Sequence, residues 1–161
     1  MLSVEEHLDN LVRHIRLVQD ACLLLGKRLI ARGRTALGRN LIAAGFQHDV
    51  SKFEGMEWKY LHAGKDVPAD KLKETVEQHQ ETNFHHPEHW GGVSEMPELY
   101  IGEMVCDWYA RSQEFGTGLR DWIEDDGMKR YNIAADSPEY KQIMYFVDIL
   151  LENHFVKEHA A

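Results

Sequence analysis

The sequence predicts an all-α protein that folds as a single compact helical bundle. Apolar residues recur at spacings of three and four along most of the chain, which is the period of a helix with one face in a core. No run alternates apolar and polar residues as a half-buried strand does, and no internal repeat or low-complexity linker divides the chain. With 161 residues and 43% hydrophobic content, one domain spanning residues 1–161 is expected.

The same periodicity, together with the residues that start and stop helices, predicts the individual segments. The apolar stripe is clearest in the first segment, where it comprises Leu8, Leu11, Ile15, Val18, Cys22 and Leu25. Pro68 and Pro138 occupy tolerated first-turn positions, while residues 86–94 and 116–118 are expected as loops. The expected helices are 4–31, about 38–49, about 54–63 with a stop at Gly64, 68–85, 96–115, 121–130 and 138–154.

Composition excludes several classes of function. No apolar stretch approaches the roughly 20 residues of a membrane span. The N-terminus lacks the features of a signal peptide, and only two cysteines are present, so a reducing cytoplasm is the expected location. A net charge of −9 argues against binding to extended nucleic acid or to an anionic membrane. A small phosphorylated substrate remains compatible with this charge, because a bound divalent metal can dominate the local field. The sequence leaves open whether the protein forms a homodimer.

Histidine is the unusual residue of this chain. There are ten histidines, and the doublet His48-Asp49 follows the apolar run 41–47 at the end of a predicted helix. Imidazole and carboxylate groups both ligate metals, and adjacent placement at a helix end lets both converge on one ion. A second group, His79, His85, His86 and His89, lies downstream. If helix continues through that segment, His79 and His86 lie two turns apart on one face.

Each of these patterns also has a structural interpretation. The downstream histidines would suit a solvated polar helix end, and His14, on the apolar side of the first helix, would suit a core. Glu103, Asp107 and Arg111 share a helical face, so Asp107 either points into a polar pocket or forms a surface pair with Arg111. The presence of all these groups in one chain favours the metal-binding interpretation over the structural one.

Taken in order, the residues resemble a known family. His14, the His48-Asp49 doublet, the downstream histidines and the late Asp107 resemble the HD-domain superfamily of metal-dependent phosphohydrolases over roughly residues 7–112. The runs His-Asp-Val-Ser-Lys-Phe, Asn-Phe-His-His-Pro-Glu-His-Trp and Glu-Met-Val-Cys-Asp-Trp are similar to a small, poorly characterised HD-like family of bacteria and phages. The Gly-Tyr-Pro signature of cyclic-dinucleotide phosphodiesterases is absent, so that substrate is not expected.

This resemblance implies an HD-like bundle, a metal site and a reaction. The implied metal ligands are His14, His48, Asp49 and Asp107, a set suited to Mn²⁺, Fe²⁺, Co²⁺, Ni²⁺, Zn²⁺ or Mg²⁺. The expected function is hydrolysis of a nucleotide or another small phosphate ester, with metal-activated water as the nucleophile.

Further roles are expected for the neighbouring residues. Asp49, Lys52 and His79 are the predicted catalytic residues, and substrate contacts are predicted for Lys52, Arg111, His85 and His86. A second metal could use His79, His85 and His86. Lys52 and Arg111 are equally interpretable as solvated surface charges.

Two other functions stay open. The first is an HD-fold di-iron oxygenase, in which the downstream histidines bind another iron. The second is a non-catalytic protein that binds metal or nucleotide for regulation. A ferritin-like carboxylate bundle and a zincin are disfavoured, because neither Glu-x-x-His nor His-Glu-x-x-His occurs in the chain.

Overall fold

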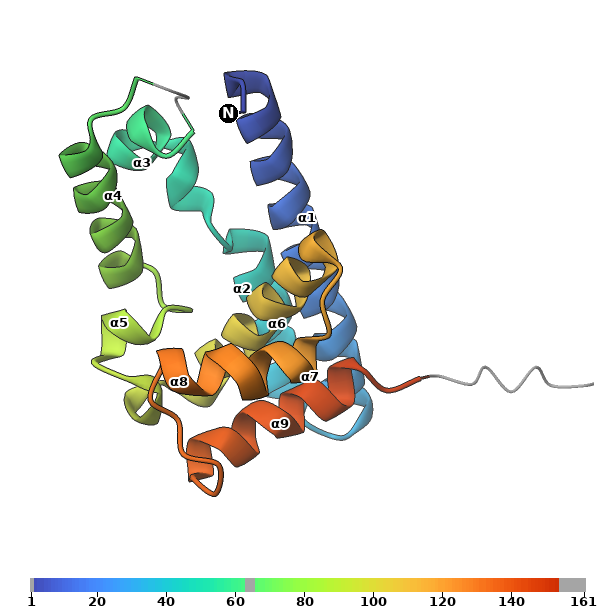
Figure 1. Cartoon of the computed structure of the whole chain (residues 1–161). Helices are drawn as coiled ribbons and strands as arrows, with labels where there is room; N and C mark the ends of the chain where they lie inside the picture. The colour runs from blue at the N-terminus through green and yellow to red at the C-terminus, as the bar shows by residue number, and fades with distance from the viewer. Residues whose placement is uncertain (1, 63–65, 154–161) are drawn as a thin grey trace, which may run out of the picture.

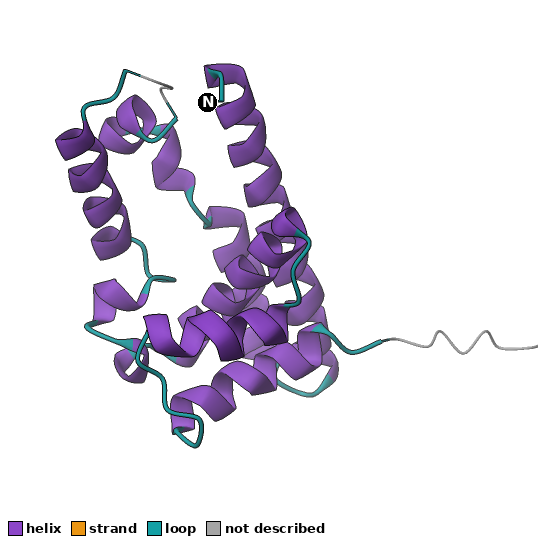
Figure 2. Cartoon of the chain, in the orientation of Figure 1, coloured by secondary structure: helices purple, strands orange, loops and turns teal. Residues whose placement is uncertain are grey.

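The computed structural model describes residues 2–62 and 66–153, and every regular element within these ranges is helical (Figure 2). The prediction of an all-α fold is therefore confirmed. In the described part of the chain, no helix combines the length and the apolar character that crossing a membrane requires. In chain order the elements are α1 Val4–Ala31, α2 Thr35–Gln47, η1 Val50–Phe53, α3 Gly55–Tyr60, α4 Ala69–Thr82, α5 Pro87–Trp90, η2 Val93–Glu95, α6 Glu98–Phe115, α7 Leu119–Trp122, η3 Ile123–Gly127, α8 Met128–Arg130 and α9 Pro138–Leu150.

The hydrophobic core lies among α1, α2, α6 and α9. Helix α1 packs along α2 and against α6, and α9 packs on α1 and α6 (Figure 1). Fully buried side chains come from each of these helices, for example Leu25, Leu41, Val105 and Phe146. Helices α3 and α4 pack on each other and form a separate side of the molecule, away from this core (Figure 1).

Glycines set the close approach of α1 to α2. A Cβ added at Gly38 would meet the carbonyl oxygen of Gly26, and one at Gly45 would meet the Cβ of Cys22. Neither neighbour is the flexible end of a side chain, so the helices would have to separate. This contact matters for the candidate site, because it places the turn of α1 that contains His14 beside the end of α2.

Most of the expected boundaries agree with the structure, and the differences have local causes. Helix α1 matches the expected range. Helix α2 begins at Thr35, earlier than expected. It ends at Gln47, because Asp49 adopts a left-handed conformation with φ 57°. The expected helix 68–85 ends at Thr82, since Asn83 is extended. The loop expected at 86–94 contains the short helices α5 and η2, the first begun by Pro87 at a tolerated position.

The remaining differences lie toward the C-terminus. The expected helix 121–130 is a continuous run from Leu119 to Arg130 with a π-helical turn at its centre. The last helix ends at Leu150, where the guanidinium of Arg28 donates to the carbonyl oxygens of Ile149 and Leu150 at 2.8 Å. The expected stops at Gly64 and His154 lie outside the described residues.

Replacing Gly38 by alanine should destabilise the fold, because the added methyl group is forced against the backbone of α1. We expect the free energy of unfolding to fall by about 1–3 kcal/mol in chemical denaturation. Gly102→Ala is the matched control, because its Cβ would make ordinary contacts of 3.5 Å with Phe146. That variant should be neutral, or stabilised by up to about 1 kcal/mol through helix propensity. Equal effects of the two substitutions would contradict the close packing.

Candidate metal centre

Asp49 is the residue on which the candidate site converges. It follows the C-cap His48 of α2, and its left-handed conformation turns the chain so that the carboxylate is buried, with 2% of the residue exposed. One carboxylate oxygen, Oδ2, lies 3.5 Å from His48 Nε2 and 3.9 Å from His14 Nε2. The same oxygen accepts a hydrogen bond of 2.6 Å from Lys52 Nζ. Both parts of the predicted doublet therefore face one point, together with His14 of α1.

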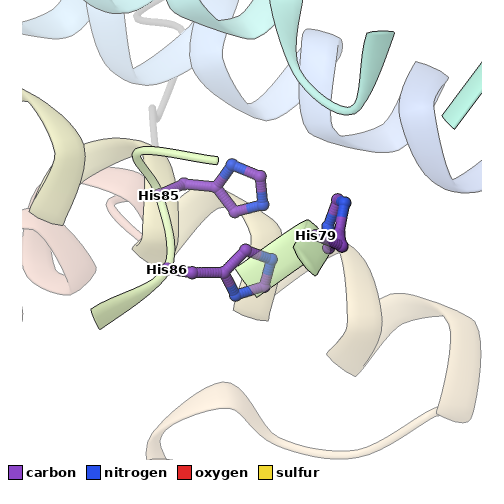
Figure 3. A group of neighbouring side chains, drawn as sticks. All are labelled: His79, His85 and His86. Carbon is purple, nitrogen blue, oxygen red and sulfur yellow. The ribbon is translucent and has the colours of Figure 1, made fainter. Parts of the chain in front are cut away.

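The other carboxylate oxygen of Asp49 faces a different set of imidazoles. Its Oδ1 lies 3.3 Å from His79 Nε2 and 3.5 Å from His85 Nε2. His86 completes this set, with its ring centroid 4.8 Å from that of His79 and 4.2 Å from that of His85. Figure 3 shows the three rings gathered together, one from the end of α4 and two from the following loop. Asp49 thus lies between two groups of histidines.

Asp107 of α6 approaches both groups. Its Oδ1 lies 3.1 Å from His14 Nε2, and its Oδ2 lies 3.9 Å from His85 Nε2. Arg111 does not pair with Asp107 as the surface interpretation expects. Its Nη1 instead bonds Glu114 Oε2 at 3.0 Å. The carboxylate of Asp107 is therefore left facing the histidines.

Four of the imidazoles have a carboxylate on the ring nitrogen that points away from Asp49. His48 Nδ1 donates to Glu103 Oε1 at 2.9 Å, and His79 Nδ1 donates to Glu57 Oε2 at 2.7 Å. A carboxylate on Nδ1 fixes the ring orientation and leaves Nε2 as the free donor atom, which is the usual arrangement around metal-bound histidine. The remaining ring-to-carboxylate distances are 3.5 Å from His85 Nδ1 to Glu103 Oε1 and 3.3 Å from His14 Nδ1 to Glu114 Oε1.

Five atoms that face the centre are buried and lack a hydrogen bond of good geometry, although Asp107 Oδ1 and Asp49 Oδ1 lie 3.1 Å and 3.3 Å from histidine Nε2 atoms. Burying an unpaired polar atom costs free energy, so several such atoms in one place call for a ligand. The donor chemistry fits a metal ion, since these are imidazole nitrogens and carboxylate oxygens. The atoms are His48 Nε2, His85 Nε2, His86 Nε2, Asp49 Oδ1 and Asp107 Oδ1.

Three groups of neighbouring residues in the described part of the chain could hold a metal ion. Within each, one ligand atom per residue lies within 4.8 Å of the others. Two of the groups, one with His14 and one with His79, correspond to the two sides of Asp49, while the third uses Glu103, which already bonds His48. These two are therefore better suited to hold ions. The groups are His14 with His48 and Asp49, His79 with His85 and His86, and His48 with His85 and Glu103.

The protonation states of most groups in this cluster favour metal binding. Burial opposes ionisation of Asp49, but the charge of His48 and the adjacent ring of His79 outweigh it, and the pKa of Asp49 lies well below its usual value. The pKa of Asp107 is lowered in the same way, mainly by His14 against burial. Burial lowers the pKa of His85 well below its usual value and that of His86 to about 4. Ionised carboxylates and neutral imidazoles are the forms that bind metals.

His48 is the exception. Burial lowers its pKa, but the charge of Asp49 and the bond to Glu103 raise it by more, so the net shift is upward. A metal cation on Nε2 would replace this proton and take over its interaction with Asp49.

A cavity of about 480 Å³ opens onto the centre, and we call it the front cavity. Its walls include the ligand-type residues His14, Asp49, His79, His85, His86 and Asp107. Three cationic side chains also line it, Lys52, Arg111 and Arg130, beside the aromatic rings of Trp108, Trp122 and Tyr131. Lys52 is only 12% exposed, whereas Arg111 is 49% exposed. Both predicted substrate-contacting cations therefore face the cavity that holds the centre.

Some residues of the site were not predicted from sequence. Glu57, Glu103 and Glu114 are the outer carboxylates of the imidazoles. Helical spacing places Glu103, four residues before Asp107, on its face, and it also places Glu114 there, seven residues after it, but neither was predicted to contact an imidazole. Glu57 has no comparable signal, because it comes from the short helix α3. His89 lies outside the centre and bonds the carbonyl oxygen of Glu81.

Fold and site together define an all-α protein with a buried histidine and carboxylate cluster that could hold metal ions. The chain belongs to the family of unknown function DUF5662, whose family model matches residues 3–148. No curated protein and no solved structure matches it. The family assigns no activity, so the function must be argued from the site itself. The resemblance to the HD-domain superfamily stays a prediction.

Removing either central carboxylate should reduce metal binding. In Asp49→Ala and Asp107→Ala, elemental analysis after incubation with Mn²⁺ should show less metal than in the wild type, because each substitution removes one of the two anionic ligands that balance the ion's charge. Glu57→Gln should weaken binding by about 10- to 100-fold through the orientation of His79. Asp70→Ala, on the exposed side of α4, is the control and should retain the wild-type metal content. Full occupancy in either alanine variant would contradict the ligand assignment.

His62 should make the metal-free protein sensitive to acid. Burial, and then the charges of Lys52 and His7, lower its pKa from 6.5 to about 4, and both ring nitrogens are buried without partners. The unfolded chain takes up this proton near pH 6.5 and the folded chain only near pH 4, so stability present above pH 6.5 is lost as the pH falls between these values. Denaturant unfolding of wild type and His62→Gln should show a smaller acid loss in the variant. An identical pH dependence would contradict this.

Proposed function

We propose that the protein is a metal-dependent hydrolase of nucleotides or other small phosphate esters, with an HD-like centre for two cations. The observation that carries the proposal is the set of unpartnered donor atoms on both sides of Asp49. In this assignment one cation would be held by His14, His48, Asp49 and Asp107. The other would be held by His79, His85 and His86, with the second oxygen of Asp49 facing this group.

The donor set narrows the choice of metal. Five imidazoles and two carboxylates favour Mn²⁺, Fe²⁺, Co²⁺, Ni²⁺ or Zn²⁺ over Mg²⁺, which prefers an all-oxygen, largely hydrated shell. Bound cations would supply Lewis acidity and lower the pKa of a water molecule to the neutral range.

The cationic residues of the front cavity are suited to the substrate. Lys52 Nζ is held 2.6 Å from Asp49 Oδ2, so its charge stays beside the centre and can neutralise a phosphate oxygen there. Arg111 and Arg130 line the same cavity and can bind further anionic oxygens in a bidentate manner. Trp108, Trp122 and Tyr131 offer apolar surface for the organic part of an ester.

His79 is better suited to ligation than to proton transfer. Its Nδ1 bonds Glu57 and its Nε2 faces Asp49, so neither nitrogen points at a leaving group. A general acid must be within hydrogen-bond reach of the atom it protonates. We therefore assign His79, with His85 and His86, to the second cation.

Hydrolysis should depend on the metal and on Lys52. A panel of nucleotides and simple phosphate esters, incubated with metal-loaded protein, should release inorganic phosphate, and chelation or Asp49→Ala should abolish this. Lys52→Ala should lower kcat/KM by about 10- to 100-fold, the value of a lost charge-assisted hydrogen bond. Lys73→Ala is the matched control, because that side chain is 77% exposed on α4. Turnover that persists without metal would contradict the proposal.

The imidazole-rich second group also favours a different reaction, a di-iron oxygenase. Three histidines on one side of a bridging carboxylate provide a nitrogen-rich site for redox-active iron. Oxygen consumption with two irons bound, in place of phosphate release, would establish that alternative. Tight metal binding with neither reaction would indicate a non-catalytic binding protein.

A further inference from the structure

A second cavity, of about 390 Å³, lies on another side of the centre, and we call it the rear cavity. It shares Asp49 and His85 with the front cavity, and it also reaches His48 and Glu103. The centre is therefore approached from two sides. Nothing in the proposed hydrolysis requires the second approach.

The two cavities differ in charge. Lys52, Arg111 and Arg130 line the front cavity, whereas no lysine or arginine occurs among the described residues that line the rear one. The front walls also hold the carboxylates of Asp49 and Asp107, which the three cationic side chains there outnumber, whereas the charged groups of the rear walls are the carboxylates of Asp49 and Glu103. A divalent cation would be repelled at the front and attracted at the rear, because surface charge focuses ions of the opposite sign into a cleft.

The neutral polar groups of the rear cavity are also suited to a hydrated cation. Amide and hydroxyl oxygens can exchange with the water shell of a divalent ion. The last residue of α2, Gln47, lies in this wall, and the C-terminal end of that 13-residue helix carries partial negative charge. The polar wall residues other than the carboxylates and histidines are Asn40, Gln47, Thr82, Asn83 and Tyr100.

We propose that the rear cavity is the route by which hydrated divalent cations reach the centre, with Glu103 as the last carboxylate before the ligands. Glu103 is suited to this position, because Oε1 contacts Nδ1 of both His48 and His85, whose opposite nitrogens are the ligand atoms. The front cavity is then left to the anionic substrate. This inference rests on the metal centre of the proposed function, but it does not depend on which reaction the centre performs.

The rate of metal uptake tests the route. Metal-free protein is mixed with Co²⁺ in a stopped-flow instrument, and the visible absorbance of the bound ion is followed at low and at high ionic strength. Asn40, exposed on α2 in the rear wall, is replaced by Lys, Asp or Gln, and Val76, exposed on α4 in the front wall, is replaced by Lys or Gln. The two sites form a matched pair, since neither belongs to the centre.

A charge at the rear should change the rate of uptake, and a charge at the front should not. Asn40→Lys should slow uptake by about two- to fourfold at low ionic strength, Asn40→Asp should accelerate it by a similar factor, and about 1 M salt should remove both effects. Asn40→Gln, Val76→Lys and Val76→Gln should match the wild type, and all variants should bind the same amount of Co²⁺ at equilibrium.

Three outcomes would overturn the inference. Slowing by Val76→Lys without slowing by Asn40→Lys would mean that ions pass through the front cavity. Rates that are insensitive to both charges would mean that neither cavity directs uptake. A wild-type protein that takes up no Co²⁺ would contradict the metal centre itself, and with it the proposed function.

Discussion

The buried carboxylate of Asp49, surrounded by imidazoles, is the interaction on which the rest of the structure depends. A carboxylate with 2% exposure would be costly to bury alone, and it is compensated by Lys52 at 2.6 Å and by histidine nitrogens on both oxygens. Each of these partners comes from a different part of the chain. The helices must therefore be placed so that their polar residues meet at a single buried point.

The packing of the helices and the outer carboxylates meet this requirement together. The glycine contacts between α1 and α2 bring His14 beside His48. From α6, Asp107 faces the centre, and Glu103 contacts the outer nitrogen of His48. Glu57 of α3 holds His79 from the far side. Because four of the five rings have a carboxylate at Nδ1, their Nε2 atoms face inward before any ion is bound, and little reorganisation is left for the binding step.

The distribution of charge gives the centre two different approaches. The whole chain carries a net charge of −9, yet the front cavity concentrates Lys52, Arg111 and Arg130 near the donor atoms. Local charge, rather than net charge, decides what enters a cleft. An acidic protein can in this way admit an anionic ester on one side while a carboxylate-lined wall on another side admits a cation.

The sequence by itself determined the helical class, the span of α1, and the residue types that can bind metal, because these depend on local periodicity and on the chemistry of single side chains. Only the tertiary structure decided which residues meet. Local spacing would bring His79 and His86 together only if the helix continued through both, but the helix ends at Thr82, and the following loop brings their rings together. Likewise, Arg111 pairs with Glu114 and leaves Asp107 to His14. Such contacts are set by the packing of helices distant in sequence, which local spacing does not encode.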